Sequence, residues 1–167
     1  PADVLIEAVW GDDPPADPNG ALQTLVSRLR ARLPDGLLET APTGYRLRAD
    51  PAIDAVLARD LVARAGDAEG PESLALLDDA LALWRGPSFA DLADRPEVEA
   101  EAVALDELHA ATAESHGQRL IKTGRAADAV APLESLVRAW PLRETAWAAL
   151  MEALARACRQ AEALRCF

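Results

Sequence analysis

Residues 19–33 read NGALQTLVSRLRARL, and this stretch decides how the first part of the chain folds. Its apolar residues recur at intervals of three and four, the pattern of a helix with one buried face: Leu22, Leu25, Val26, Leu29 and Leu33. The opposite line of the helix carries only small residues: Gly20, Thr24, Ser27 and Ala31. Long side chains flank this line, with Gln23 and Arg30 on one side and Arg28 and Arg32 on the other, and the stretch has no acidic residue.

A narrow ridge of small residues between long cations suits a helix that enters the major groove of DNA. There the backbone can come close to the base edges while the arginines reach bases or phosphates. The same pattern also fits a plain surface helix, or a ridge that packs on another helix. The helix alone leaves all three interpretations open.

Two short runs of β-type residues follow this helix. They are Leu37–Thr40 and Tyr45–Arg48, and the proline- and glycine-containing segment APTG at residues 41–44 lies between them. Such an arrangement predicts a β-hairpin. Alternation along the second strand places Arg46 and Arg48 on one face, with Tyr45 and Leu47 on the other.

The order of helix, hairpin and GYR resembles the OmpR/PhoB-type winged-helix domain. Three segments carry the resemblance: LIEAVWGD at 5–12, ALQTLVSRLRARL at 21–33 and TGYRLR at 43–48. It implies that residues 1–49 form a winged helix-turn-helix DNA-binding domain whose N-terminal sheet and first helix are missing. It also implies that residues 19–33 form the recognition helix and that the hairpin forms the wing.

We therefore expect contacts with double-stranded promoter DNA from both of these elements. Base edges are assigned to Thr24 and Ser27 of the ridge and to Arg28, and phosphates to the other two arginines of the helix and to the hairpin. The predicted DNA-binding residues are Gln23, Thr24, Ser27, Arg28, Arg30, Arg32, Thr43, Tyr45 and Arg46. The predicted wing tip, residues 41–42, offers no arginine, so minor-groove binding by the wing is not expected.

Composition separates the two ends of the 167-residue chain. Residues 1–50 hold eight acidic residues and five arginines, a net charge of −3, and all five arginines fall between positions 28 and 48. Residues 51–167 hold twenty acidic and twelve basic residues, a net charge of −8, which would repel phosphates. Half of all residues are hydrophobic and only 4% are aromatic, a helix-rich composition without a membrane-spanning run.

Local start and stop signals divide most of the chain into helices. Before the recognition helix, Asp3–Trp10 is predicted as a short helix capped by Asp3 and ended by Gly11, and Asn19 is predicted to cap the recognition helix. Beyond the junction at residues 49–51, the predicted helices are Ile53–Ala65, Pro71–Arg85, Pro96–Thr123, Arg125–Trp140, Leu142–Arg156 and one beginning at Arg159.

These later helices predict an α-solenoid or bundle of tetratricopeptide type. Gly124-Arg125 and Cys158-Arg159 begin similar runs with an offset of 34 residues, which is the period of that repeat. Three segments also resemble the bacterial transcriptional activator domain: DDALALWRGPSFADL at 78–92, WPLRETAWAALMEAL at 140–154 and RQAEALRCF at 159–167. Cys158 departs from the glycine that such repeats usually carry at the turn.

This second resemblance implies a SARP-type regulator, a DNA-binding activator of secondary-metabolite or other pathway-specific genes. Residues 52–167 would be the activator domain, truncated at its C-terminus, in a mainly α fold. The implied partners are promoter repeats, RNA polymerase and a second copy of the chain. The implied location is the cytoplasm, in keeping with two cysteines too far apart on one helix to form a disulfide.

The remaining candidate residues favour structural roles, and neither an enzyme nor a cofactor nor a metal is expected. His109 and His116 would share a helix face without a third ligand. Trp84, Trp140 and Trp147 fall at periodic apolar positions typical of a core, and Arg85 and Arg143 are expected to bridge carboxylates. Two alternatives to DNA binding stay open: a tetratricopeptide-like adaptor and a module that senses a small ligand.

Overall fold

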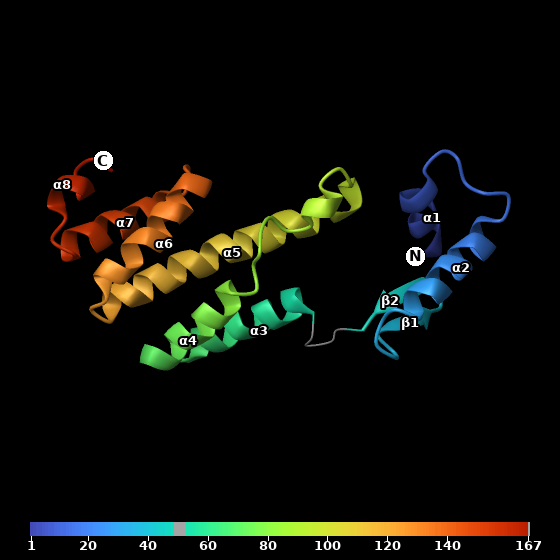
Figure 1. Ribbon diagram of the computed structural model, residues 1–167, viewed down its shortest axis with the longest axis horizontal. Helices are drawn as coiled ribbons and strands as arrows, with labels where there is room; N and C mark the ends of the chain where they lie inside the picture. The colour runs from blue at the N-terminus through green and yellow to red at the C-terminus, as the bar shows by residue number, and fades with distance from the viewer. Residues whose placement is uncertain (49–52, 167) are drawn as a thin grey trace. The chain divides into compact units, whose positions relative to one another are not determined.

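The computed structural model describes residues 1–48 and 53–166 and is mainly helical, as the sequence predicts (Figure 1). The contacts within the chain divide it into two compact units, Pro1–Ile53 and Asp54–Phe167. The described residues contain one two-stranded sheet, which belongs to the first unit.

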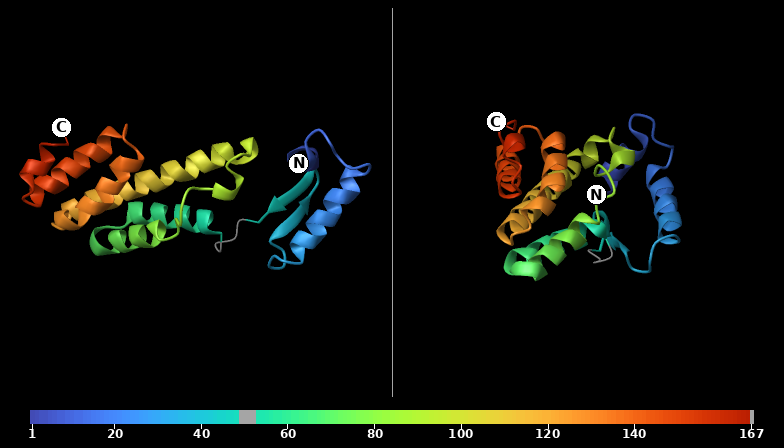
Figure 2. Two further views of the ribbon diagram at one scale, coloured as in Figure 1. Left: turned by 45° about the horizontal axis from the view of Figure 1, so that its top comes forward. Right: turned by 60° about the vertical axis from the view of Figure 1, so that its left-hand side comes forward.

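The first unit consists of two helices and a hairpin (Figure 2). Helix α1 spans Ala2–Trp10 and α2 spans Pro18–Arg30, while the antiparallel strands β1 and β2 span Leu38–Ala41 and Gly44–Leu47. Helix α1 packs on α2 and on β2, and the amide of Ala2 donates a hydrogen bond to the carbonyl of Thr43 at 3.0 Å. The predicted order of helix, helix and hairpin is confirmed.

The N-cap of α2 differs from the prediction by two residues. Asp17 rather than Asn19 is the N-cap, because its Oδ1 accepts a hydrogen bond from the Gly20 amide at 3.0 Å. Pro18 then begins the helix, where the missing amide hydrogen costs nothing. Pro1 likewise replaces Asp3 as the N-cap of α1, whereas Gly11 ends that helix as predicted, with a φ of 55°.

The predicted apolar face of α2 is only partly buried. Leu22 and Val26 are 5% and 7% exposed, but Leu25 and Leu29 are 40% and 47% exposed. Within the described residues, the elements that contact α2 cover the side of this helix that carries Leu22 and Val26. The prediction that all these positions lie inward is therefore wrong for Leu25 and Leu29.

The second unit is a series of helices, most of them packed on their neighbours in the chain. The long helix α5 also contacts α7. Figures 1 and 2 show these helices lying side by side. Their bounds are α3 Asp54–Asp67, α4 Gly70–Leu81, the short 3-10 helix η1 Ala90–Leu92, α5 Pro96–Lys122, α6 Ala126–Ala139, α7 Glu144–Arg156 and α8 Gln160–Ala163.

The core of this unit is built from leucine and alanine. Its main cluster joins α5, α6 and α7, and its largest fully buried members include Leu133, Leu150 and Leu154. Trp140 and Trp147 are partly buried against this cluster, which confirms their predicted structural role. Gly117 of α5 lies so close to Leu133 of α6 that a Cβ atom there would come within 2.8 Å of the leucine side chain. Small residues thus let these helices approach closely.

The 34-residue offset in the sequence corresponds to a repeated turn geometry. Gly124 and Cys158 both have a positive φ, of 81° and 60°. The next amide in each turn, that of Arg125 or Arg159, donates to the carbonyl five residues earlier at 2.8 Å. This is the bond that ends a helix in a Schellman motif. Both helical turns are therefore closed in the same way, one with glycine and one with cysteine.

Two sequence-based expectations about the helical unit need correction. The helix predicted to reach Arg85 ends at Leu81, because residues 82–84 continue as a turn with shorter-range hydrogen bonds. The two cysteines do not lie on one helix, because α7 ends at Arg156 and Cys158 lies in the turn that follows. Both thiols are free.

Candidate nucleic-acid interface

The ridge of small residues on α2 faces outward. Thr24, Ser27 and Ala31 are exposed, and so are the four long side chains that flank them. The Thr24 hydroxyl donates to the Gly20 carbonyl at 2.9 Å, which leaves its oxygen able to accept a hydrogen bond from outside. Amino groups of adenine and cytosine are donors of this kind in the major groove.

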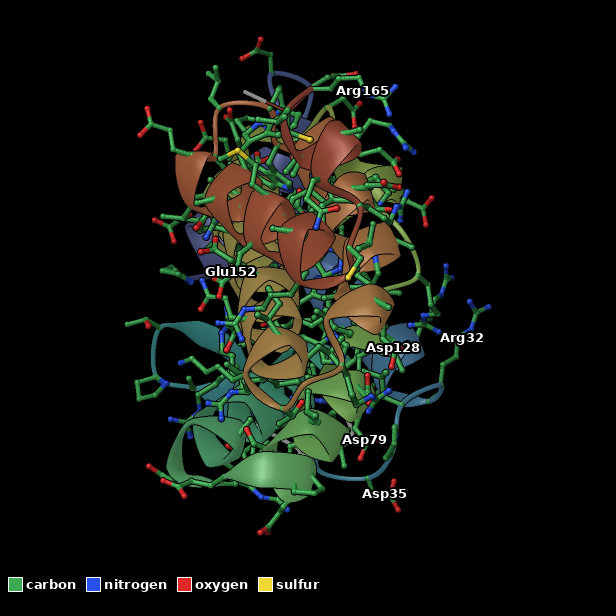
Figure 3. All side chains as sticks on the ribbon, turned by 90° about the vertical axis from the view of Figure 1, so that its left-hand side faces the viewer. Arg32, Asp35, Asp79, Asp128, Glu152 and Arg165 are labelled. Atoms are coloured by element: carbon green, nitrogen blue, oxygen red, sulfur yellow. The ribbon has the colours of Figure 1, made fainter. Side chains whose placement is uncertain are left out.

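The predicted recognition helix ends at Arg30 rather than Leu33, and Arg32 lies in the turn that follows α2. The arginines of α2 and of this turn differ in what they contact. Among residues 1–48 and 53–166, the side chains of Arg28 and Arg32 have no hydrogen-bond or ion-pair partner, and Figure 3 shows the labelled Arg32 extending outward from the ribbon. Two cations on one flank of the ridge are thus available to an anionic partner. Such side chains are suited to phosphate oxygens or to the acceptor edge of guanine.

Arg30, on the other flank, is engaged with the hairpin. Its Nε donates to the Leu38 carbonyl at 3.0 Å and its Nη2 donates to Thr40 Oγ1 at 2.8 Å. Its guanidinium carbon also lies 5.8 Å from the centre of the Tyr45 ring. The sequence predicts a phosphate contact for Arg30 as it does for Arg32. No spacing in the sequence could have revealed this contact, because it depends on how the hairpin packs.

The hairpin adds further polar groups next to α2. Arg46 Nη2 lies 3.0 Å from Glu39 Oε2, its partner across the two strands, and the arginine side chain is 71% exposed. An exposed ion pair of this kind contributes little to stability, so it can open at low cost. Thr43 is exposed near the turn, and Tyr45 is half-buried. The structure thus brings all nine predicted DNA-binding residues onto α2, the turn that follows it and the adjoining hairpin.

The charge of this surface differs in sign from that of the helical unit. Between residues 18 and 48 there are five arginines against Asp35 and Glu39, whereas residues 54–167 hold twenty acidic and twelve basic residues. A polyanion is therefore attracted to α2 and the hairpin and repelled by the helical unit.

Two arginines of the helical unit pair with carboxylates of the same unit. Arg143 bridges Glu107 and Glu114 at 2.7 Å each, which confirms its predicted bridging role, whereas Arg85 pairs with one carboxylate, that of Asp54, at 3.0 Å. The hydrogen bonds that Arg143 donates, first to Glu114 and then to Glu107, raise the pKa of Arg143 above its usual value. Arg143 therefore stays charged.

The two histidines pack against neighbours within the helical unit. His116 is buried, with Nε2 2.9 Å from Asp78 Oδ1. The ring of His109 stacks on Trp84 with 4.9 Å between centroids, and burial lowers the pKa of this histidine. Within the part of the chain that the structure describes, no group of three or more metal-ligating side chains comes together. No described helix is long and apolar enough to cross a membrane.

Comparison with known proteins places this architecture among transcription regulators. The profile of the bacterial transcriptional activator domain matches residues 53–167. The chain is 38% identical over 166 residues to the regulatory protein AfsR of Streptomyces coelicolor, covering 96% of the chain and 17% of that protein. It is 36% identical over 178 residues to the transcriptional regulatory protein EmbR of Mycobacterium tuberculosis, covering 97% of the chain and 45% of that protein.

A solved structure agrees over nearly the whole chain. The structure of Mycobacterium tuberculosis EmbR in complex with a low-affinity phosphopeptide matches with a TM-score of 0.84 and 32% sequence identity, covering 99% of this chain and 46% of that one. The chain spans less than half of the length of AfsR and of EmbR. The similarity therefore extends across both units, while large parts of these relatives lie outside it.

Proposed function

Because the chain belongs to the SARP-type transcriptional regulators, the family marked by the bacterial transcriptional activator domain, we propose that its first unit binds double-stranded promoter DNA. In this proposal residues 1–49 are part of a winged helix, α2 is the recognition helix and the hairpin is the wing. Residues 52–167 are the activator domain, a tetratricopeptide-like array of helices that contacts other proteins.

One observation carries the proposal. The ridge of α2 is exposed, small and flanked by two unpartnered arginines, while a hairpin packs beside the same helix. We assign base contacts to Thr24, Ser27 and Arg28, with Gln23 beside them. We assign phosphate contacts to Arg32, Thr43, Tyr45 and Arg46.

The helical unit takes the protein partners in this proposal. Its net negative charge disfavours DNA, and its helices present a large surface built on a rigid core. RNA polymerase and a second copy of the chain are the partners we propose. Binding as a dimer would suit promoter sites arranged as repeats, because two equivalent units then read two equivalent half-sites.

Replacing Arg28 tests the assignment of base contacts. The intact protein is first used to select a preferred duplex from a random library, and affinities are then measured at fixed salt. If Arg28 makes a bidentate contact to guanine, Arg28→Ala should cost about 1–3 kcal/mol, which is about 5- to 140-fold in affinity. Arg138→Ala is the matched control, since it removes an exposed arginine from α6.

Two results contradict parts of this proposal. Unchanged affinity of Arg28→Ala for the selected duplex removes Arg28 from the base contacts. A wild-type protein without any salt-dependent affinity for duplex DNA removes the DNA-binding function and favours an adaptor or a ligand-sensing module. Thermal stabilisation by a small metabolite would then separate these two alternatives.

A further inference from the structure

We propose that Arg30 is a positioning residue that fixes the hairpin against α2, rather than a phosphate ligand as its sequence position suggests. This inference rests on the proposed function, because a hairpin held in place against α2 allows the helix and the hairpin to contact DNA at the same time. It changes the expected behaviour of Arg30 in every DNA-binding measurement.

The contacts of Arg30 reach both strands of the hairpin. Its Nε and Nη2 donate to Leu38 and Thr40 of β1, and its guanidinium lies over the ring of Tyr45 in β2. Thr40 and Tyr45 are paired directly across the two strands, so their side chains project from the same face. One planar group thus contacts the hairpin at three points, which restricts its rotation about α2.

These contacts occupy the edge of the guanidinium that is best suited to an anion. A bidentate arginine–phosphate contact uses two parallel N–H groups, and the Nε–Nη2 edge already donates to the hairpin. A phosphate could take this edge only if both hydrogen bonds to the hairpin broke. Arg28 and Arg32 meet no such competition, because their side chains have no partner among the described residues.

Lysine cannot replace arginine in this role. Its ammonium is a point charge without a planar fork, so it cannot donate in one plane to both Leu38 and Thr40. Lysine can still neutralise a phosphate, however. The variant Arg30→Lys therefore separates the two roles: it keeps a phosphate ligand and loses a positioning residue.

The first measurement is the salt dependence of binding by the intact protein to a 24-base-pair duplex of mixed sequence. Each phosphate contact contributes about 0.9 to the slope of log affinity against log salt. We expect Arg30→Ala and Arg30→Lys to weaken binding alike, by about fivefold or more, with an unchanged slope. Arg32→Ala, the matched control, should reduce the magnitude of the slope by about 0.9. The proposal would be overturned if Arg30→Ala had a slope of smaller magnitude than the wild type and Arg30→Lys had the wild-type slope.

The second measurement needs no DNA. Amide hydrogen exchange of residues 38–47 should be faster in Arg30→Ala and Arg30→Lys than in the wild type, and unchanged in Arg32→Ala. Unchanged exchange in Arg30→Ala would overturn the positioning role. Failure of the wild type to bind DNA would instead overturn the proposed function, and exchange would still decide whether Arg30 fixes the hairpin.

A third variant covers the case in which Arg30→Ala does not fold. Thr40→Val removes the acceptor of the Nη2 hydrogen bond and keeps a β-branched side chain of nearly the same shape. It leaves every positive charge in place. We expect faster hairpin exchange and weaker DNA binding with an unchanged salt slope. If Thr40→Val matches the wild type in both measurements, the hydrogen bond has no positioning effect and the proposal fails.

Discussion

Replacing Cys158 by glycine should stabilise the helical unit. Cys158 has a φ of 60°, in the left-handed region, which costs a residue with a Cβ atom about 1–2 kcal/mol. Its side chain is exposed, so little packing is lost when it is removed. Glycine also raises the conformational entropy of the unfolded chain, which offsets about 0.5–1 kcal/mol of this gain. The expected net gain is therefore about 0.5–1 kcal/mol in the free energy of unfolding.

Gly124 provides the reciprocal experiment in the same molecule. It ends α5 with a φ of 81° and the same 2.8 Å hydrogen bond in its turn, and nothing lies within 4 Å of the position that a Cβ atom would take. Gly124→Cys therefore introduces backbone strain without a steric clash. We expect it to lower the free energy of unfolding by about the amount that Cys158→Gly raises it.

Urea unfolding followed by circular dichroism, with a reducing agent present, measures both changes. The urea dependence should stay the same, so that the midpoint alone moves. Thermal midpoints should shift by about 2–4 °C for each kcal/mol in a chain of this size. A Cys158→Gly variant that is no more stable than the wild type, at an unchanged urea dependence, would refute the reasoning that this turn is strained.

Two further predictions concern the helical unit. Arg143→Ala should lower the free energy of unfolding by about 2 kcal/mol, because the side chain of Glu114 is only 12% exposed and loses its cation. Glu107→Ala should lower it by less than about 1 kcal/mol, because Glu107 is 54% exposed. Equal losses for the two variants in urea unfolding would contradict this prediction. Because burial lowers the pKa of His109 from 6.5 in the folded state, the unfolded chain binds the proton more readily, and stability should fall as the pH drops below 6.5. His109→Gln should flatten this decline between pH 7.5 and 5, and an unchanged pH profile of stability would contradict the assignment.

The helices of the second unit were largely predictable because their start and stop signals are local. Pro96 begins α5 as expected, since proline is well tolerated in the first turn. Gly124 closes the turn after it with the left-handed conformation that glycine favours. Where such a signal is missing the prediction ran too far, as at Arg85, which lies beyond the end of α4.

Burial and capping in the first unit were less predictable because they depend on competition between neighbours. Asp17 and Asn19 are both good N-caps, and the proline at position 18 decides in favour of Asp17 by taking the first helical position. Leu25 and Leu29 satisfy the helical period but are half-exposed. Periodicity identifies which residues share a face of a helix, but it does not say how much of that face is covered.

The three arginines between residues 28 and 32 show the same limit at the candidate site. In a helix that continued at about 100° per residue, Arg28 and Arg32 would lie only about 40° apart, with Arg30 on the other flank of the ridge. In the structure Arg32 lies in the turn that follows α2. The sequence therefore predicted that the arginines lie on two flanks of the ridge. It did not predict that Arg30 contacts the hairpin, because it did not show which flank the hairpin covers. The hydrogen bonds to Leu38 and Thr40 show that the hairpin lies on the Arg30 flank. In the proposed complex the phosphates nearest α2 should then lie on the flank of Arg28 and Arg32, where no described side chain competes for the cations.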